Sequence, residues 1–118
     1  MRAYSLLFIS LVFGLTGCGA SPCGNEVITE LPSPSKSYIA TVFERNCGAT
    51  TPYVRVVALR PFGSKLNAES HDDWVFTTEG QPAVEIKWID NNTLEIKSSG
   101  GGHPGTQRNA WKQVKIAY

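Results

Sequence analysis

The sequence has no excess of charge of either sign. Its 118 residues contain 11 Lys and Arg against 10 Asp and Glu, and the formal net charge is +1. Removal of Arg2 with a leader segment, argued below, takes the 11 basic residues to 10 and balances the two signs. Nucleic acids and anionic lipids attract proteins through clustered positive charge. The composition therefore argues against a nucleic-acid partner and against electrostatic adhesion to a membrane.

The sequence also lacks a long apolar run. A helix that crosses a bilayer needs about 20 apolar residues, whereas residues 6–15 form a shorter run with Ser10 inside it. This run follows Met1 and Arg2 and precedes small residues, which is the composition of a secretory signal peptide. We find no internal repeat and no amphipathic helix of useful length.

Residues 15–18, Leu-Thr-Gly-Cys, fit the lipobox of bacterial lipoproteins, an aliphatic residue followed by two small residues and a cysteine. The small residues fit the site of the signal peptidase, and the thiol receives a diacylglycerol. We predict a signal peptide over residues 1–17 and a lipid on Cys18, which attaches the chain to the membrane of the bacterial cell envelope. The alternative is an ordinary signal peptide with a chance cysteine. Gly19 stands where an Asp typically retains lipoproteins at the inner membrane, so the periplasmic face of the outer membrane is favoured if the source has two membranes.

Cysteine is scarce. Of three cysteines, Cys18 is assigned to the lipid, which leaves Cys23 and Cys47 as a pair in an oxidising setting. A disulfide between them would close a loop of about 25 residues and contribute on the order of 3 kcal/mol to the free energy of unfolding. Two free thiols or pairing between molecules are the alternatives. Metal ligation is not expected, because thiolate zinc sites usually have closely spaced cysteine pairs.

Strand patterns occupy most of the remaining chain. Residues 18–26 are small and polar and are predicted to be a lipidated tether, followed by a β domain over residues 27–118. The segment 65–73 is predicted to be an exposed loop or a short helical turn, and residues 98–108 a Gly-rich loop. The predicted strands, which are separated by turn signals, cover residues 26–31, 38–45, 53–60, 74–78, 84–88, 94–97 and 111–118. This pattern predicts an all-β fold, a single small antiparallel meander that forms a sandwich or a partly open barrel.

Two tryptophans differ in their expected position. Trp88 alternates in phase with Val84 and Ile86, so it is expected in the core. Trp111 is out of phase with Val114 and Ile116, and we expect it to be exposed.

Histidine is limited to His71 and His103. His71 lies with Glu69, Asp72 and Asp73, which are metal-ligand residue types, but their spacing matches no calcium loop. His103 stands in a Gly-rich stretch that lacks the Lys-Ser or Lys-Thr of a phosphate loop. We expect no catalytic residue, no metal site and no cofactor, and we take His71, Asp72, Asp73 and His103 as candidate binding-loop residues.

Most of the chain that follows the predicted signal peptide resembles a group of small bacterial exported proteins. The similarity extends through residues 88–96, and the residues that carry it are Ser33-Pro34, Tyr38-Ile39-Ala40, Phe43-Glu44-Arg45 and Cys47-Gly48-Ala49-Thr50-Thr51. The resemblance implies a unit of two strands joined by a Cys-Gly-Ala-Thr-Thr turn and implies no activity. The Ser-Pro entry also resembles repeats of TolB-type propellers, which have Asp-Gly where this chain has Ser35-Lys36. One copy cannot close a propeller.

We therefore expect a membrane-anchored lipoprotein that is not an enzyme and that binds an envelope protein, with its oligomeric state left open. The main alternative is an inhibitor of a secreted hydrolase, resembling in size and architecture the small periplasmic β-barrel lipoproteins that block lysozymes. Such an inhibitor would insert residues 98–108 or 46–52 into the enzyme cleft. A small enzyme is the third class.

Overall fold

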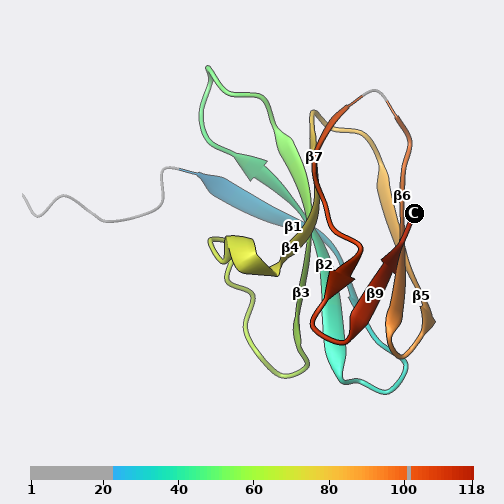
Figure 1. Cartoon of the computed structure of the whole chain (residues 1–118). Coiled ribbons are helices and arrows are strands. Elements are labelled where there is room, and N and C mark those ends of the chain that lie inside the picture. The colour runs from blue at the N-terminus through green and yellow to red at the C-terminus, as the bar shows by residue number, and fades with distance from the viewer. Residues whose placement is uncertain (1–22, 101) are drawn as a thin grey trace, which may run out of the picture.

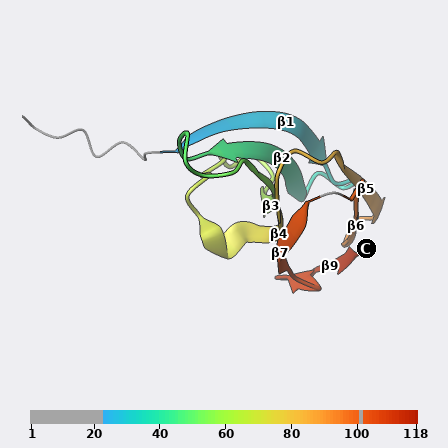
Figure 2. The ribbon, with the colours of Figure 1, turned by 90° about the horizontal axis from the view of Figure 1, so that it is seen from above.

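Nine β-strands form two sheets in the computed structural model, which describes residues 23–100 and 102–118. Sheet A has the order β1-β2-β3-β4-β7, and sheet B has the order β5-β6-β9-β8. The two sheets face each other as layers (Figure 1) and curve toward each other when seen from above (Figure 2). The elements are β1 Gly24–Pro32, β2 Tyr38–Asn46, β3 Val54–Pro61, the 3-10 turn η1 His71–Asp73, β4 Trp74–Glu79, β5 Val84–Asp90, β6 Thr93–Ser98, β7 His103–Gln107, β8 Ala110–Trp111 and β9 Val114–Ala117.

The predicted all-β class is confirmed, as two mostly antiparallel sheets that do not close into a barrel. The predicted signal peptide, Cys18 and tether residues 18–22 lie outside the described residues. Within the described ranges, no helix is both long and apolar enough to cross a bilayer.

The hairpin β5–β6 follows the predicted alternation. Glu85 lies opposite Lys97, and Lys87 lies opposite Glu95, so opposite charges face each other across the strands. The intervening positions point inward, and Trp88 is 9% exposed, as the periodicity predicts. Its indole Nε1 donates to a backbone carbonyl of β1 at 2.9 Å, which ties the two sheets together.

Most of the core lies between the two sheets. Burial of this apolar surface is the main term that stabilises the fold. Sheet A contributes Ala40, Val42, Val57, Leu59, Val75 and Phe76, and sheet B contributes Trp88, Leu94, Ile96, Trp111, Val114 and Ile116.

Strands β2 and β3 bury their second face as well. Phe43, Val56 and Ala58 form a smaller cluster on the outer face of sheet A. Leu66 and Ala68, from the segment between β3 and β4, pack over it. The expectation of a short helical turn in this segment is confirmed by η1, but the segment also covers an apolar surface.

The sequence predicts a loop over residues 98–108, and this is wrong for its second half, because His103–Gln107 forms β7 and pairs with β4. A glycine permits the close approach of these strands. A Cβ atom on Gly105 would lie 2.7 Å from Oγ1 of Thr77, closer than side chains tolerate. That same hydroxyl accepts a hydrogen bond from the Thr106 backbone N–H at 2.8 Å.

The prediction that Trp111 is exposed is also wrong, because its side chain is 4% exposed. The turn between β8 and β9 places Trp111 directly opposite Val114, and paired residues share a face of the sheet. Lys112 in that turn has a φ of 48°. The alternation of strand positions therefore does not continue through this turn, so counting back from Val114 assigned Trp111 to the wrong face of the sheet.

Two further details differ from an uninterrupted meander. Strand β9 runs parallel to β6, because the chain leaves sheet B for β7 and then returns. Strand β1 begins at Gly24, so residues 24–26 of the predicted tether belong to sheet A.

Ser33 organises the turn between β1 and β2. It is 2% exposed, and its Oγ accepts hydrogen bonds from the backbone N–H groups of Ser37 and Tyr38, both at 3.1 Å. Its backbone N–H donates to the Tyr38 carbonyl at 2.8 Å, and its carbonyl accepts from Lys36 at 2.8 Å. The Ser-Pro motif therefore has a structural explanation here, because one buried hydroxyl satisfies two turn amides.

Replacing Ser33 with Ala should lower the free energy of unfolding by roughly 1–3 kcal/mol, because the amides of Ser37 and Tyr38 lose their acceptor. Urea denaturation measures the change. Ser35→Ala is the matched control, since Ser35 is exposed and its hydroxyl forms a hydrogen bond with the exposed hydroxyl of Ser37. Equal stability of the two variants would contradict the capping role.

Candidate functional site

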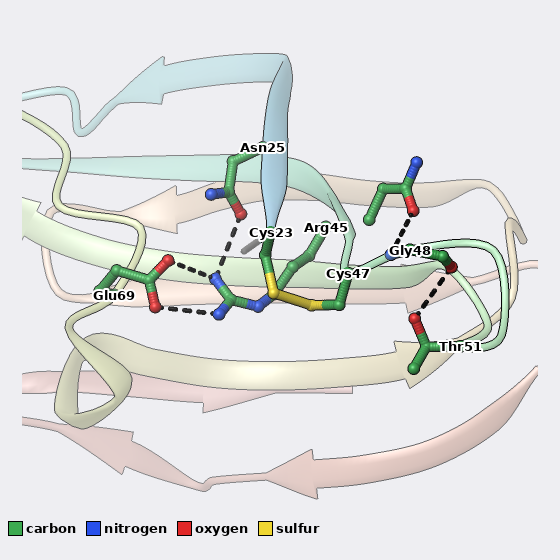
Figure 3. The surroundings of a disulfide bond; sticks show 8 residues. Cys23, Asn25, Arg45, Cys47, Gly48, Thr51 and Glu69 are labelled. Carbon is green, nitrogen blue, oxygen red and sulfur yellow. Dashed lines mark hydrogen bonds and ion pairs between the residues drawn. A yellow bond between two sulfur atoms is a disulfide. The ribbon is translucent and has the colours of Figure 1, made fainter. Parts of the chain in front are cut away.

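The disulfide between Cys23 and Cys47 closes the end of sheet A where the chain enters from its N-terminal segment (Figure 3). The two residues occupy the position next to the Gly24–Asn46 pair of the β1–β2 ladder, with their Cα atoms 3.9 Å apart. The predicted pairing is confirmed. Because the bond spans a sequence separation of 24, it removes conformational freedom chiefly from the unfolded chain. The first described residue is thus fixed directly to the sheet.

The Cys-Gly-Ala-Thr-Thr segment beyond the bridge is a turn with its own hydrogen bonds. The Gly48 N–H donates to Oδ1 of Asn46 at 3.1 Å, and the Gly48 carbonyl accepts from both N and Oγ1 of Thr51. Gly48 has a φ of 123°, which residues with a Cβ rarely adopt. The motif that carries the family resemblance therefore has a local structural role.

An aromatic and charged cluster covers the outer face of sheet A beside the disulfide. The Arg45 guanidinium makes a two-pronged contact with the Glu69 carboxylate, with both N–O distances 2.9 Å. Its central carbon lies 5.4 Å from the centre of the Trp74 ring, a cation–π distance. His71 stacks on Trp74 with ring centres 3.9 Å apart. This arrangement fastens the segment between β3 and β4 to the sheet.

The structure does not bring the four candidate binding-loop residues together. His71, Asp72 and Asp73 form η1, immediately before the start of β4. His103 lies opposite Glu79, at the other end of β4. Five residue steps along a strand span roughly 17 Å, so the histidines cannot share one small ligand.

Two of the three acidic side chains near His71 are engaged in other contacts. Asp73 accepts from the Ser70 hydroxyl at 2.8 Å and from the indole Nε1 of Trp111 at 3.1 Å. Glu69 is paired with Arg45. In the described part of the chain, no three His, Cys, Asp or Glu side chains are grouped so as to hold a metal ion.

A polar groove that the sequence did not reveal lies on the inner face of sheet A, near the disulfide. Glu26 faces Glu44 across β1 and β2, and Glu44 faces Arg55 across β2 and β3. Gln81 donates to Glu44 at 2.5 Å, while Arg55 approaches the same carboxylate at 3.9 Å. The groove measures about 370 Å³ and is lined by Gly24, Asn25, Glu26, Glu44, Asn46, Tyr53 and Gln81. Sequence gave no signal for it, because these residues come from four separate segments.

A second cleft, of about 560 Å³, opens between the sheets on the β7 side. Its walls include Phe76 from sheet A and Ile96 from sheet B, with Tyr118 at the rim. The Tyr118 hydroxyl donates to the Arg108 carbonyl at 2.6 Å, and burial raises the pKa of this phenol. Apolar side chains, hydroxyl groups and the charged side chain of Lys97 line this cleft together, so its lining does not select one class of ligand.

Replacing Arg45 with Ala should loosen the segment between β3 and β4 while leaving the sheets folded. Loss of the Glu69 contact and of the Trp74 stacking should cost about 1 kcal/mol, which corresponds to roughly fivefold faster proteolytic cleavage of residues 62–73. Limited proteolysis followed by mass spectrometry measures the rate. Lys65→Ala, in the same exposed segment, is the control and should be cleaved as fast as the unaltered chain. Unchanged cleavage of Arg45→Ala would contradict the fastening role.

The comparisons with known proteins assign the chain to no family. No family model, no curated protein and no solved structure matches the chain. The resemblance to small bacterial exported proteins therefore stays a prediction.

Proposed function

We propose that this protein is a bacterial lipoprotein, held in the cell envelope by a diacylglycerol on Cys18, that binds an envelope protein without catalysing a reaction. The observation that carries the proposal is the disulfide at the base of the tether. Five residue steps separate Cys18 from Cys23, which is fixed to the end of sheet A. Five steps reach at most about 18 Å, so a lipid on Cys18 holds the folded domain directly at the membrane surface.

The contacts of the polar side chains support binding over catalysis. Arg45, Glu69 and Asp73 fasten the β3–β4 segment, and the two histidines lie at opposite ends of β4. Catalysis by general acids and bases needs such groups to converge on one reacting atom. Here they serve packing instead.

Strand β1 supplies a surface for a partner. It is an edge of sheet A, and eight of its nine residues are exposed. Val27 and Ile28 are 48% and 44% exposed, and an open edge can accept an extended segment of another chain. The register shift near Ile28, together with Glu26 and Glu30, restricts indiscriminate pairing. A partner segment that carries basic and apolar residues fits this edge best.

The expected location is the outer membrane if the source has two membranes, because Gly19 follows Cys18. An inhibitor of a secreted hydrolase gains no support from the segment 98–108, since residues 103–107 are committed to β7.

Replacing Cys18 with Ser should abolish both lipid labelling and membrane attachment, because the thiol is the acceptor of the diacylglycerol. Labelling with a radioactive fatty acid and fractionation of the cells measure the two effects. Cys23→Ser is the matched control: it removes a nearby cysteine and should leave both lipid and attachment intact. A Cys18→Ser chain that stays with the membrane fraction would refute the lipid anchor.

Replacing Val27 with Glu should reduce crosslinking of the anchored protein to its envelope partner at least fivefold, because it adds a charge to the exposed apolar part of β1. Crosslinking in intact cells and identification of the products by mass spectrometry measure the loss. Ile89→Glu is the matched control, since Ile89 is a comparably exposed apolar residue on the edge strand of sheet B, at 52%. Loss of the same product in both variants would refute binding through β1.

A further inference from the structure

The described residues of the connections at one end of the sandwich include no charged residue. This end, here called the tether-side end, carries the start of β1 and the connections β2–β3, β4–β5 and β6–β7. Figure 1 shows these connections at the same end, above the sheets in that view. The described residues of this end are 23–25, 46–54, 80–84, 98–100 and 102–104, and none of them is Lys, Arg, Asp or Glu.

Most connections at the opposite end of the sandwich contain a charged residue. Balanced charge in the whole chain therefore conceals an uneven distribution between the two ends. The connections at this opposite end contain or adjoin Lys36, Lys65, Asp72, Asp73, Asp90, Arg108 and Lys112. Glu69, from the segment between β3 and β4, instead lies against Arg45 near the disulfide. Asp90 accepts from the Asn92 backbone N–H at 2.8 Å, and this hydrogen bond lowers the pKa of the carboxyl group.

The contrast depends on strand direction and on sequence together. Successive strands run up and down, so every second connection reaches the same end. Residues 46–54 and 80–84 are far apart in sequence but share this end because β3 and β4 lie between them. The charged side chains nearest this end belong to the strands: Arg45 lies opposite Asn25 and Val54, and Glu79 lies opposite Val54 and His103. Arg45 is paired with Glu69.

A charged group held against a low-dielectric bilayer loses hydration, which is costly without a partner. Uncharged hydroxyl, amide and small residues avoid this cost and can exchange hydrogen bonds with lipid headgroups. Tyr53 is 42% exposed at this end, and tyrosine is enriched at the level of the headgroups. No basic patch is needed for attraction when covalent lipid supplies the attachment.

We infer that the tether-side end rests on the headgroup surface of the bilayer, with the charged end facing away from it. The inference rests on the proposed lipid anchor at Cys18. The surface that contacts the tether-side end is a phospholipid bilayer. The chain leaves the domain at this end, and Cys23 is only five residues from the proposed lipid on Cys18. His103 is exposed at this end and lies opposite Glu79.

The test measures the accessibility of the two ends in the lipidated full-length protein. An azide-bearing amino acid is placed at Thr50, on the uncharged end, or at Asn91, in the β5–β6 turn at the charged end; both positions are exposed, and the disulfide stays intact. Each protein is reconstituted into vesicles of phosphatidylethanolamine and phosphatidylglycerol. A cyclooctyne that carries a polyethylene glycol chain then reacts with the outward-facing molecules.

We expect the reaction at Thr50 to be at least fivefold slower on vesicles than in the soluble Cys18→Ser form, and the reaction at Asn91 to be unchanged. Equal rates at Thr50 in a chain whose lipid is verified by mass and by flotation would overturn the orientation alone. A wild-type chain without lipid would overturn the anchor and this inference with it. Protection of Thr50 in whole cells but not on vesicles would refute contact of this end with the bilayer, since another envelope component would then cover it.

Discussion

Strands β2 and β3 have apolar side chains on both faces. The rest of the chain must therefore cover both faces of sheet A. Val42 and Val57 point between the sheets, while Phe43 and Val56 point to the outside of sheet A, and all four are fully buried. A two-sided apolar sheet needs a cover on each face. Sheet B covers the inner face, and the segment between β3 and β4 covers the outer one.

This constraint explains why the most suggestive polar residues are structural. The outer cover is a chain segment without regular strands, so it contributes little backbone pairing to the sheet. Side-chain contacts hold this segment in place instead. Arg45 pairs with Glu69 and lies over the Trp74 ring, and Asp73 accepts a hydrogen bond from the Trp111 indole. In sequence, Glu69, His71 and Asp73 resemble a ligand site. Their contacts in the structure show that they attach the segment between β3 and β4 to the sheets.

The fold was predictable from sequence where its determinants are local. Strand alternation in residues 84–97 identified the β5–β6 hairpin and the burial of Trp88, and the small number of cysteines identified the bridge. Sequence failed where a distant partner decides. His103–Gln107 is poor in β-branched residues and pairs with β4 because Gly105 fits against Thr77. Trp111 is buried because the turn at Lys112 resets the phase of alternation.

The candidate surfaces were less predictable than the fold, for the same reason. The groove around Glu44 and the open edge of β1 depend on which strands neighbour each other, which no short motif encodes. The direction of each strand decides which connections lie at the same end of the sandwich, and composition alone does not show this. The uncharged stretches 46–54 and 80–84 are unremarkable separately, and only the alternation of strand direction places them at one end. Because the disulfide fixes Cys23 to that end, the proposed lipid on Cys18 would bring these uncharged connections close to the bilayer, where a charged side chain would lose part of its hydration.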